Sequence, residues 1–199
     1  MKVAAPKAIV PGERRVAIVP ETVTRLKKLG LEVLIQAGAG ESAGFLDAAY
    51  ESAGAKIVSE PVVMYSEADL VVLPNAPTAE QLSAMRRGTM LFAVLSPLSN
   101  HDLVKQCASA GIIAISLDLM PRITRAQKMD VLSSQSTVSG YQAVLLAATN
   151  LPKMFPLLMT AAGTITPAKV LVLGAGVAGL QAIATAKRLG AVVEAFDVR

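Results

Sequence analysis

One repeated unit restricts the fold of this chain more than any other feature: a helical pattern ends at a glycine, and a short apolar strand follows at once. It occurs as KKLG-LEVLIQ, ESAG-AKIV, MRRG-TMLFAVL, CASAG-IIAIS and AKRLG-AVVEAF, at Gly30, Gly54, Gly88, Gly111 and Gly190. Glycine readily takes the left-handed conformation that closes the carboxyl end of a helix. The strands are rich in Val, Ile and Leu without polar alternation, which is typical of a parallel sheet covered on both faces. The repetition therefore predicts an α/β, doubly wound fold.

Three helix starts carry recognisable residues. Pro20 suits the first position of the helix PETVTRLKKL. Thr78, with Gln81 three residues later, forms a capping-box pattern before an apolar run. Asn100 is a good N-cap for HDLVKQCASA.

The composition excludes several classes of protein. Of the 199 residues 53% are hydrophobic, yet no apolar run reaches the ~18 residues of a membrane span. The doubtful region, residues 140–163, is interrupted by Asn150 and two prolines and is interpreted as buried helix. The amino terminus MKVAAPKAIV lacks a secretory signal, and the single cysteine, Cys107, excludes an internal disulfide, so a cytoplasmic location is expected.

The charge pattern argues against nucleic-acid and metal binding. The net charge is +4, but the basic pairs are scattered, and the three Tyr and four Phe are the only aromatic residues. Nucleic-acid binding favours a basic stripe or interleaved aromatic residues. With one histidine, the sequence shows no metal-ligand cluster.

A domain boundary is predicted after residue 132. Residues 1–132 form an α/β domain of about four strand–helix units, and residues 133–199 form a connecting helix and the first βαβ unit of a second domain. An apolar turn of helix is expected before TITPAK. Because clefts often lie between domains, the polar segment 122–136 is a candidate cleft wall. The connecting helix is expected to bury one face, made of Val138, Tyr141, Val144, Leu145 and Ala148.

The strongest local motif is G-x-G-x-x-G at Gly174, Gly176 and Gly179, between the strand KVLVL and the helix VAGLQAIATAKRLG. The first glycine permits the tight turn, the second leaves room for a pyrophosphate, and the third lets helix and strand pack closely. The phosphates are expected at the amino end of the helix, where free N–H groups and the dipole favour anions. A glycine-rich turn without a ligand is the alternative interpretation.

An acidic residue follows at the expected distance. Asp197 ends the next strand, where a carboxylate reaches the ribose hydroxyls and repels a 2′-phosphate, so NAD is favoured over NADP. Glu194 is a rival that lies in mid-strand, and Arg199 is the residue that argues for NADP. The chain stops there, so the second domain is expected to be truncated.

Three segments together resemble the alanine dehydrogenase and transhydrogenase superfamily, and most of all its proton-translocating NAD(P) transhydrogenases. They are PGERRVAIVPETVTRLKKLG, RITRAQKMDVLSSQSTVSGYQAV and VLVLGAGVAGLQAIATAKRLGAVVEAFDVR, and the resemblance covers essentially the whole chain. The pattern R-I-x-R-A-Q-x-x-D, which starts at Arg122, is much more specific than the glycine motif.

The resemblance implies two Rossmann-like parallel-sheet domains with NAD(H) between them, and a homodimer. It implies hydride transfer between NADH held here and NADP(H) held on a partner domain, coupled to proton translocation through a membrane domain. Neither partner domain is in this sequence. The chain is therefore expected to be a fragment of a protein that is peripheral to the cytoplasmic membrane through its partner subunits.

The resemblance also assigns roles to residues. Arg122 and Ser133 would hold the nicotinamide amide or its ribose, Asp130 would hold Gln127 and Arg122, and Gln127 would reach toward the other nucleotide. Hydride transfer between two rings requires alignment rather than a protein acid or base, and amides and hydroxyls suit that task. The other implied contacts are Ile123, Thr124 and Arg125 near the nicotinamide, Val177 under the nucleotide, and Asp197, Val198 and Arg199 at the adenosine end.

The sequence departs from the alanine dehydrogenases at their substrate site. Those enzymes use a Lys and a His, and the matching segments here, VVLPNAPT and FAVLSPLSN, contain neither. His101 falls at a helix start and is interpreted as a surface or capping residue. Arg15 matches the family's substrate-binding Arg and is interpreted as structural or vestigial. An NAD-dependent alanine-type dehydrogenase and a non-catalytic nucleotide-binding module are the alternative functions.

Overall fold

The computed structural model describes residues 1–198 and divides the chain into two compact units, Met1–Pro121 and Arg122–Arg199. The boundary predicted after residue 132 falls within the second unit, just inside its first long helix. That boundary stays a prediction, and the two units are described separately.

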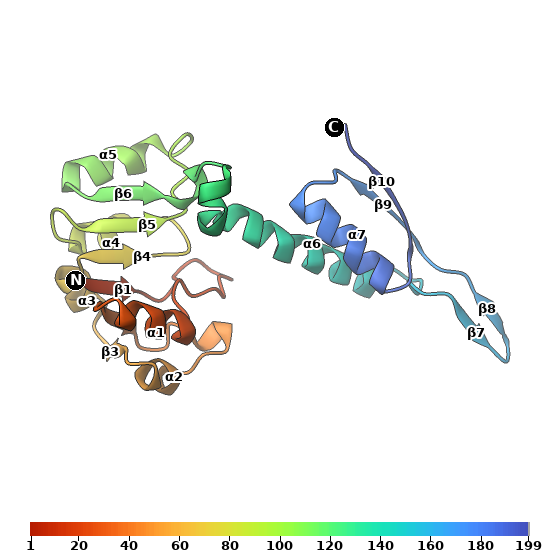
Figure 1. The fold of residues 1–199 in the computed structure, drawn as a ribbon, viewed down its shortest axis with the longest axis horizontal. Helices are drawn as coiled ribbons and strands as arrows, with labels where there is room; N and C mark the ends of the chain where they lie inside the picture. The colour runs from red at the N-terminus through yellow and green to blue at the C-terminus, as the bar shows by residue number, and fades with distance from the viewer. Residues whose placement is uncertain (199) are drawn as a thin grey trace. The chain divides into compact units, whose positions relative to one another are not determined.

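The first unit is built on a six-stranded sheet in which every pair of neighbouring strands is parallel (Figure 1). The strand order is β3-β2-β1-β4-β5-β6. This order starts from a central strand and winds outward in both directions, which defines a doubly wound sheet. The strands are β1 (Lys2–Ala5), β2 (Glu32–Gln36), β3 (Lys56–Val58), β4 (Leu70–Val72), β5 (Met90–Ala93) and β6 (Ile113–Ser116).

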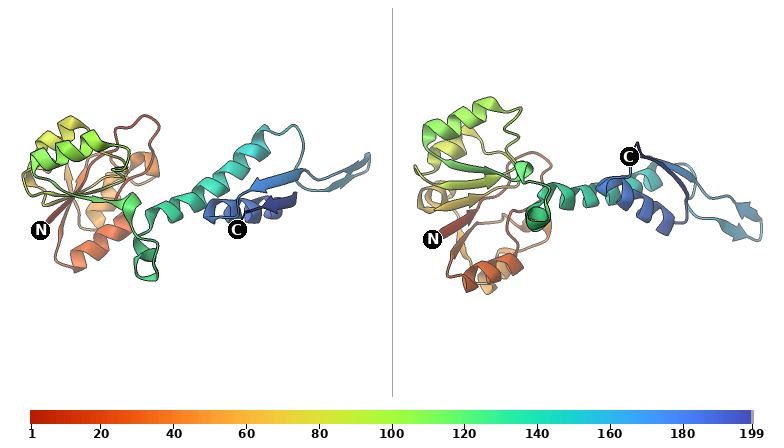
Figure 2. Two further views of the ribbon diagram at one scale, coloured as in Figure 1. Left: turned by 90° about the horizontal axis from the view of Figure 1, so that it is seen from above. Right: turned by 45° about the horizontal axis from the view of Figure 1, so that its top comes forward.

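Helices cover both faces of this sheet (Figures 1 and 2). Along β1, Val3 and Ala5 enter one apolar cluster with Val23 and Tyr50, whereas Ala4 enters the opposite cluster with Met64. The central strands are therefore buried on both faces, as their apolar sequences predicted. The prediction was wrong for the edge strand β6, where Ile113 is 55% exposed. The helices are α1 (Pro20–Lys28), η1 (Glu41–Ala43), α2 (Asp47–Ser52), α3 (Pro61–Glu67), α4 (Ala79–Ala84), α5 (His101–Ala110) and η2 (Leu117–Leu119).

Four of the five predicted helix ends are confirmed, and the exception is Gly88, because α4 ends at Ala84 and Gly88 lies in a separate turn before β5. The five glycines that precede strands all have positive φ, between 67° and 95°. Pro20 occupies the first turn of α1. The Thr78 hydroxyl accepts a hydrogen bond from the Gln81 N–H at 3.2 Å, and the Gln81 side chain accepts one from the Thr78 N–H at 2.9 Å. The Asn100 side chain accepts a bond from the third residue of α5.

The second unit contains the predicted βαβ element. Strands β9 (Lys169–Leu173) and β10 (Val192–Phe196) pair in parallel, and α7 (Val177–Arg188) connects them. The chain reaches β9 through η3 (Thr124–Met129) and the long helix α6 (Val131–Asn150), which lies beside α7 (Figures 1 and 2). Among residues 1–198, no helix combines the length and apolarity needed to cross a membrane.

The apolar turn of helix expected before TITPAK was wrong. Strands β7 (Leu158–Thr160) and β8 (Gly163–Ile165) form an antiparallel hairpin there. Gly163 has a φ of 135°, which residues with a side chain rarely adopt. The Thr160 hydroxyl accepts a bond from the Ala162 N–H and donates to the Gly163 carbonyl, so local bonds close the turn.

The buried face expected for α6 was only partly right. Val144 is 5% exposed, but Val138 and Tyr141 are 58% and 47% exposed. Gly140 is buried instead, so the buried stripe is rotated relative to the predicted one. The interpretation of residues 140–163 as buried helix therefore holds for one stripe of α6 only and was wrong beyond Asn150, where this helix ends.

Candidate functional site

The glycine-rich turn follows β9 and leads directly into α7. Gly174 has a φ of 99°, so its tight turn requires glycine. Gly176 is the N-cap residue of α7, and among residues 1–198 no side chain caps this helix end. A Cβ built on Gly176 would find no atom within 4 Å, so the surface of the turn is open. An uncapped helix amino end beside an open glycine turn can receive an anion.

Gly179 shows the close packing expected from its position in the motif. A Cβ at this residue would lie 1.8 Å from the Gly174 carbonyl oxygen and 3.5 Å from Val172 Cγ1. A side chain would therefore collide with the turn itself. The third glycine holds α7 against the end of β9 and fixes where the helix begins relative to the turn.

Asp197 is tied to the same turn. Its Oδ2 accepts a hydrogen bond from the Ala175 N–H at 2.6 Å, across the carboxyl ends of β9 and β10. The carboxylate therefore lies at the edge of the turn, whereas Glu194 is an exposed mid-strand residue. A contact between Asp197 and a ribose stays a prediction. Val177 and Val198 are 44% and 90% exposed, and Arg199 lies outside the described residues.

The polar segment that precedes α6 forms the 3-10 helix η3. Ala126 is 2% exposed and anchors this short helix, whereas Gln127 on the next position is exposed. Among the residues that the structure describes, no hydrogen bond to the Gln127 side chain is present. Its amide is thus presented to solvent from an anchored turn. The predicted contact residues Arg122, Ile123, Thr124 and Arg125 are exposed as well.

Asp130 caps α6 and holds Ser133. Its carboxylate accepts a hydrogen bond from the Ser133 N–H at 2.9 Å and one from the Ser133 hydroxyl at 2.7 Å. These bonds from Ser133, together with the positive charge of Arg122, lower the pKa of Asp130 despite some desolvation. Asp130 was expected to hold Gln127 and Arg122. In this structure its carboxylate is bonded to Ser133, and the expected roles toward Gln127 and Arg122 stay predictions.

Gly140 was not identified from the sequence as a contact residue of this region. A Cβ on Gly140 would lie 2.1 Å from the carbonyl oxygen of Ala178, the second residue of α7. The backbones of α6 and α7 therefore touch at the amino end of α7, next to the glycine turn. A lone glycine inside a helical pattern is the signal that identifies such a contact.

Arg15 in the first unit is bound to a neighbouring carboxylate. Its guanidinium donates to both oxygens of Glu13, at 2.8 and 2.6 Å, and the Glu13 side chain is 9% exposed. The hydrogen bond from Arg15, with a further one from Asn75, lowers the pKa of Glu13 from 4.5 to about 2. This pairing supports the interpretation of Arg15 as structural.

We expect this pair to make stability depend on pH. Because the folded-state pKa of Glu13 is depressed, its contribution is complete above pH 4.5 and is lost as the pH falls toward 2. Wild type should lose about 2 kcal/mol more unfolding free energy over this range than Glu13→Gln, allowing for the exposed guanidinium. Urea unfolding followed by circular dichroism measures this, with Glu51→Gln, an exposed carboxylate of α2, as control. Equal pH profiles for wild type and Glu13→Gln would contradict the pairing.

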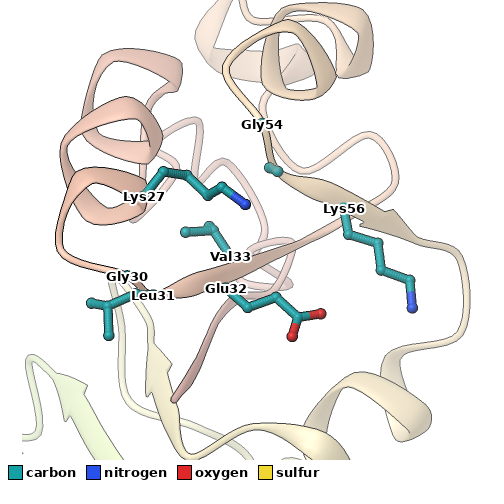
Figure 3. A pocket seen from close by; sticks show the side chains of 8 residues that line it. Lys27, Gly30, Leu31, Glu32, Val33, Gly54 and Lys56 are labelled. Atoms are coloured by element: carbon teal, nitrogen blue, oxygen red, sulfur yellow. The ribbon is translucent and has the colours of Figure 1, made fainter.

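A shallow pocket of about 470 Å³ lies at the amino ends of β2 and β3 (Figure 3). The stem of Lys27 covers Gly54, and Glu32 and Lys56 extend at its rim. Ligands of open α/β sheets bind outside the carboxyl ends of the strands. This pocket is at the opposite ends and is not a candidate for the dinucleotide.

The doubly wound sheet and the glycine-rich βαβ turn define a Rossmann-like protein of the nucleotide-binding class. Residues 4–139 match the family described as "Alanine dehydrogenase/PNT, N-terminal domain", and residues 143–199 match "Alanine dehydrogenase/PNT, C-terminal domain". The chain belongs to the alanine dehydrogenase/PNT family. The resemblance inferred from the sequence is thereby confirmed.

Relatives named as transhydrogenases share more identity with this chain than relatives named as alanine dehydrogenases. The first segment of the NAD(P) transhydrogenase alpha subunit of Rhodospirillum rubrum is 50% identical over 100% of this chain and 53% of its own length. A crystal structure of transhydrogenase from Sinorhizobium meliloti matches with a TM-score of 0.97 and 47% identity, covering 100% of this chain and 59% of that one. A solved L-alanine dehydrogenase matches with a TM-score of 0.87 and 30% identity, covering 100% and 55%. The chain thus spans about half the length of the Rhodospirillum relative.

Proposed function

We propose that this chain is the NAD(H)-binding portion of a proton-translocating NAD(P) transhydrogenase. Similarity along the whole of this chain to proteins named as transhydrogenase alpha subunits carries the proposal. The glycine turn supports it, because an uncapped helix end beside Gly176 suits a pyrophosphate. The bound NAD(H) supplies or accepts the hydride, and NADP(H) is held on a partner domain.

The chain's own residues position the nicotinamide. Ser133 is held by Asp130 and presents its hydroxyl oxygen from the first turn of α6. The positive charge of Arg122 interacts with the Asp130 carboxylate. Gln127 extends an exposed amide from the anchored η3 turn, which suits contact with a second nucleotide. No acid or base is needed, since aligned rings and excluded water provide for hydride transfer.

The partners follow from the same proposal. The relatives are named as alpha subunits, so other subunits complete the protein. We propose that an NADP(H)-binding domain and a membrane domain lie on those subunits or regions, that the protein forms a homodimer, and that it lies at the cytoplasmic face of the membrane through its partners. Two Rossmann-like domains, with a boundary after residue 132, belong to this proposal.

Asp197→Ala should weaken NADH binding about 10- to 150-fold, because loss of a charged hydrogen-bond partner costs about 1.5–3 kcal/mol. The change removes a proposed ribose contact and also frees the Ala175 N–H in the turn. Titration calorimetry on the full-length protein measures the affinity. The control is Glu194→Ala, the exposed carboxylate in the same strand, which should leave the affinity unchanged. If NADH affinity were unchanged in Asp197→Ala, or lowered in Glu194→Ala, the ribose contact would have to be assigned to another residue.

Mixing the full-length protein with a transhydrogenase NADP(H)-binding domain tests the proposed activity. Reduction of an NAD analogue by NADPH should occur only when both components are present. Turnover with neither partner nor NADPH, but with an amino acid and NAD⁺, would identify an alanine-type dehydrogenase instead. Binding of NADH without turnover in either assay would leave a nucleotide-binding module.

A further inference from the structure

The run of hydroxyl side chains at the start of α6 contains one member that differs from its neighbours. Ser133 donates to Asp130, and Ser134 donates to the Asp130 carbonyl. Thr137 and Ser139 donate to carbonyls one turn earlier in the helix. In the described part of the chain, no hydrogen bond to the hydroxyl of Ser136 is present, although this residue is half-buried. Its donor is therefore available to a ligand.

Ser136 lies on the face of α6 that meets α7. Residues four apart share one face of a helix, so Ser136, Gly140 and Val144 lie in line. Gly140 touches the Ala178 backbone, and Val144 packs with Ala186 further along α7. Later residues of α6 thus meet later residues of α7, so the two helices run in the same direction (Figure 1).

This direction places Ser136 in front of the amino end of α7. It is one turn before Gly140, about 6 Å closer to the start of α6. Gly140 lies against Ala178, the second residue of α7. Ser136, one turn earlier in α6, therefore lies beyond the first residue of α7, in the space in front of that helix. Anions on a helix amino end occupy this space. The nearby turn is open, because a Cβ on Gly174 or Gly176 would meet no atom within 4 Å.

We propose that the Ser136 hydroxyl donates a hydrogen bond to the nicotinamide-side phosphate of bound NAD(H). This rests on the proposed function, which assigns the nicotinamide end to Ser133, one turn earlier on the same face, and the adenosine end to Asp197. A group between Ser133 and the helix amino end meets the phosphate on the nicotinamide side. Helix α6 then binds the dinucleotide at two levels, Ser133 at the ring and ribose and Ser136 at the phosphate.

Affinities of the full-length protein for a series of nucleotides test this contact. AMP carries only the adenosine-side phosphate, ADP carries both, and ADP-ribose adds the second ribose. Ser136→Ala should lower the affinity for ADP, ADP-ribose and NADH by a similar factor of about ten, and the affinity for AMP by less than twofold. Ser134→Ala is the matched control, because its exposed hydroxyl is bonded within the helix. Ser136→Thr keeps a hydroxyl and should recover most of the affinity.

The other outcomes are distinct. Weaker ADP-ribose with unchanged ADP would place the contact on the ribose and overturn the phosphate assignment. If Ser136→Ala lost equal affinity for AMP and ADP, or if its affinities equalled those of Ser134→Ala, Ser136 would have no role in binding this phosphate. Failure of the wild-type protein to bind NADH would overturn the proposed function itself. Circular dichroism on each variant shows that the helix is retained.

Discussion

Gly179→Ala should cost both stability and NADH binding. The added Cβ would lie 1.8 Å from the Gly174 carbonyl oxygen, well inside van der Waals contact, so either α7 or the turn must shift. Overpacking of this kind typically costs about 1–3 kcal/mol, and a backbone atom yields less than a flexible side chain, so we expect about 3 kcal/mol. The displaced turn no longer presents its N–H groups correctly, and NADH affinity should fall on the order of 100-fold. Urea unfolding and calorimetric titration measure the two effects.

Gly176→Ala is the matched control, because it separates packing from ligand contact. Gly176 has a φ of −72° and open space around its missing Cβ, so alanine fits the free protein without strain. Stability should therefore stay within about 0.5 kcal/mol of wild type, whereas NADH binding should weaken because the methyl group occupies phosphate space. Unchanged NADH affinity in Gly176→Ala would show that no pyrophosphate approaches this turn. Wild-type stability in Gly179→Ala would contradict the close packing.

The layout of the first unit was predictable because its signals are local. Each glycine before a strand has a positive φ, and the Thr78–Gln81 box needs only residues three apart. Strands without polar alternation implied burial on both faces, which the two apolar clusters of the sheet confirm for the central strands. Such features depend on backbone conformation and on neighbours in sequence, so one chain suffices to recognise them.

The features that were missed are of two kinds: a contact between distant segments, and local bonds whose choice of partner the sequence pattern leaves open. The buried stripe of α6 is set by Gly140 against Ala178, a contact between two helices that hydrophobic periodicity does not report. The β7–β8 hairpin depends on the conformation of Gly163 and a side-chain bond from Thr160 rather than on apolar content. The bond from Ser133 to Asp130 competes with any bond from Asp130 to Gln127, and the sequence pattern contains both possibilities.

The candidate site shows the same division. The positions of the three motif glycines in the turn were predictable, since spacing alone places them between a strand and a helix. The Gly140 contact and the proposed role of Ser136 are recognisable only once α6 is placed beside α7. Because α6 packs on α7 through Gly140, the turns of α6 that precede Gly140 lie near the amino end of α7.

Gln127→Asn should slow hydride transfer on the order of 100-fold and leave NADH affinity within about twofold, since a misplacement of about 1 Å can cost that much rate. The substitution keeps the amide but shortens its reach by one methylene. Gln127 is exposed on η3, and among residues 1–198 no bond to its side chain supports the fold, so the change should leave the structure intact. The effect should therefore appear in the single-turnover rate with NADPH on the partner domain.

Lys128→Asn tests whether any change on this surface has the same effect. Lys128 is the exposed neighbour of Gln127 in η3, and its replacement alters the charge next to the amide without altering the amide itself. We expect a single-turnover rate within a few-fold of wild type and a normal NADH affinity. If Gln127→Asn instead lost NADH affinity in proportion to its rate, Gln127 would be a ligand of the bound dinucleotide. A rate loss without an affinity loss assigns it to the approach of the second ring, where an exposed amide on an anchored turn has the reach and the freedom to act.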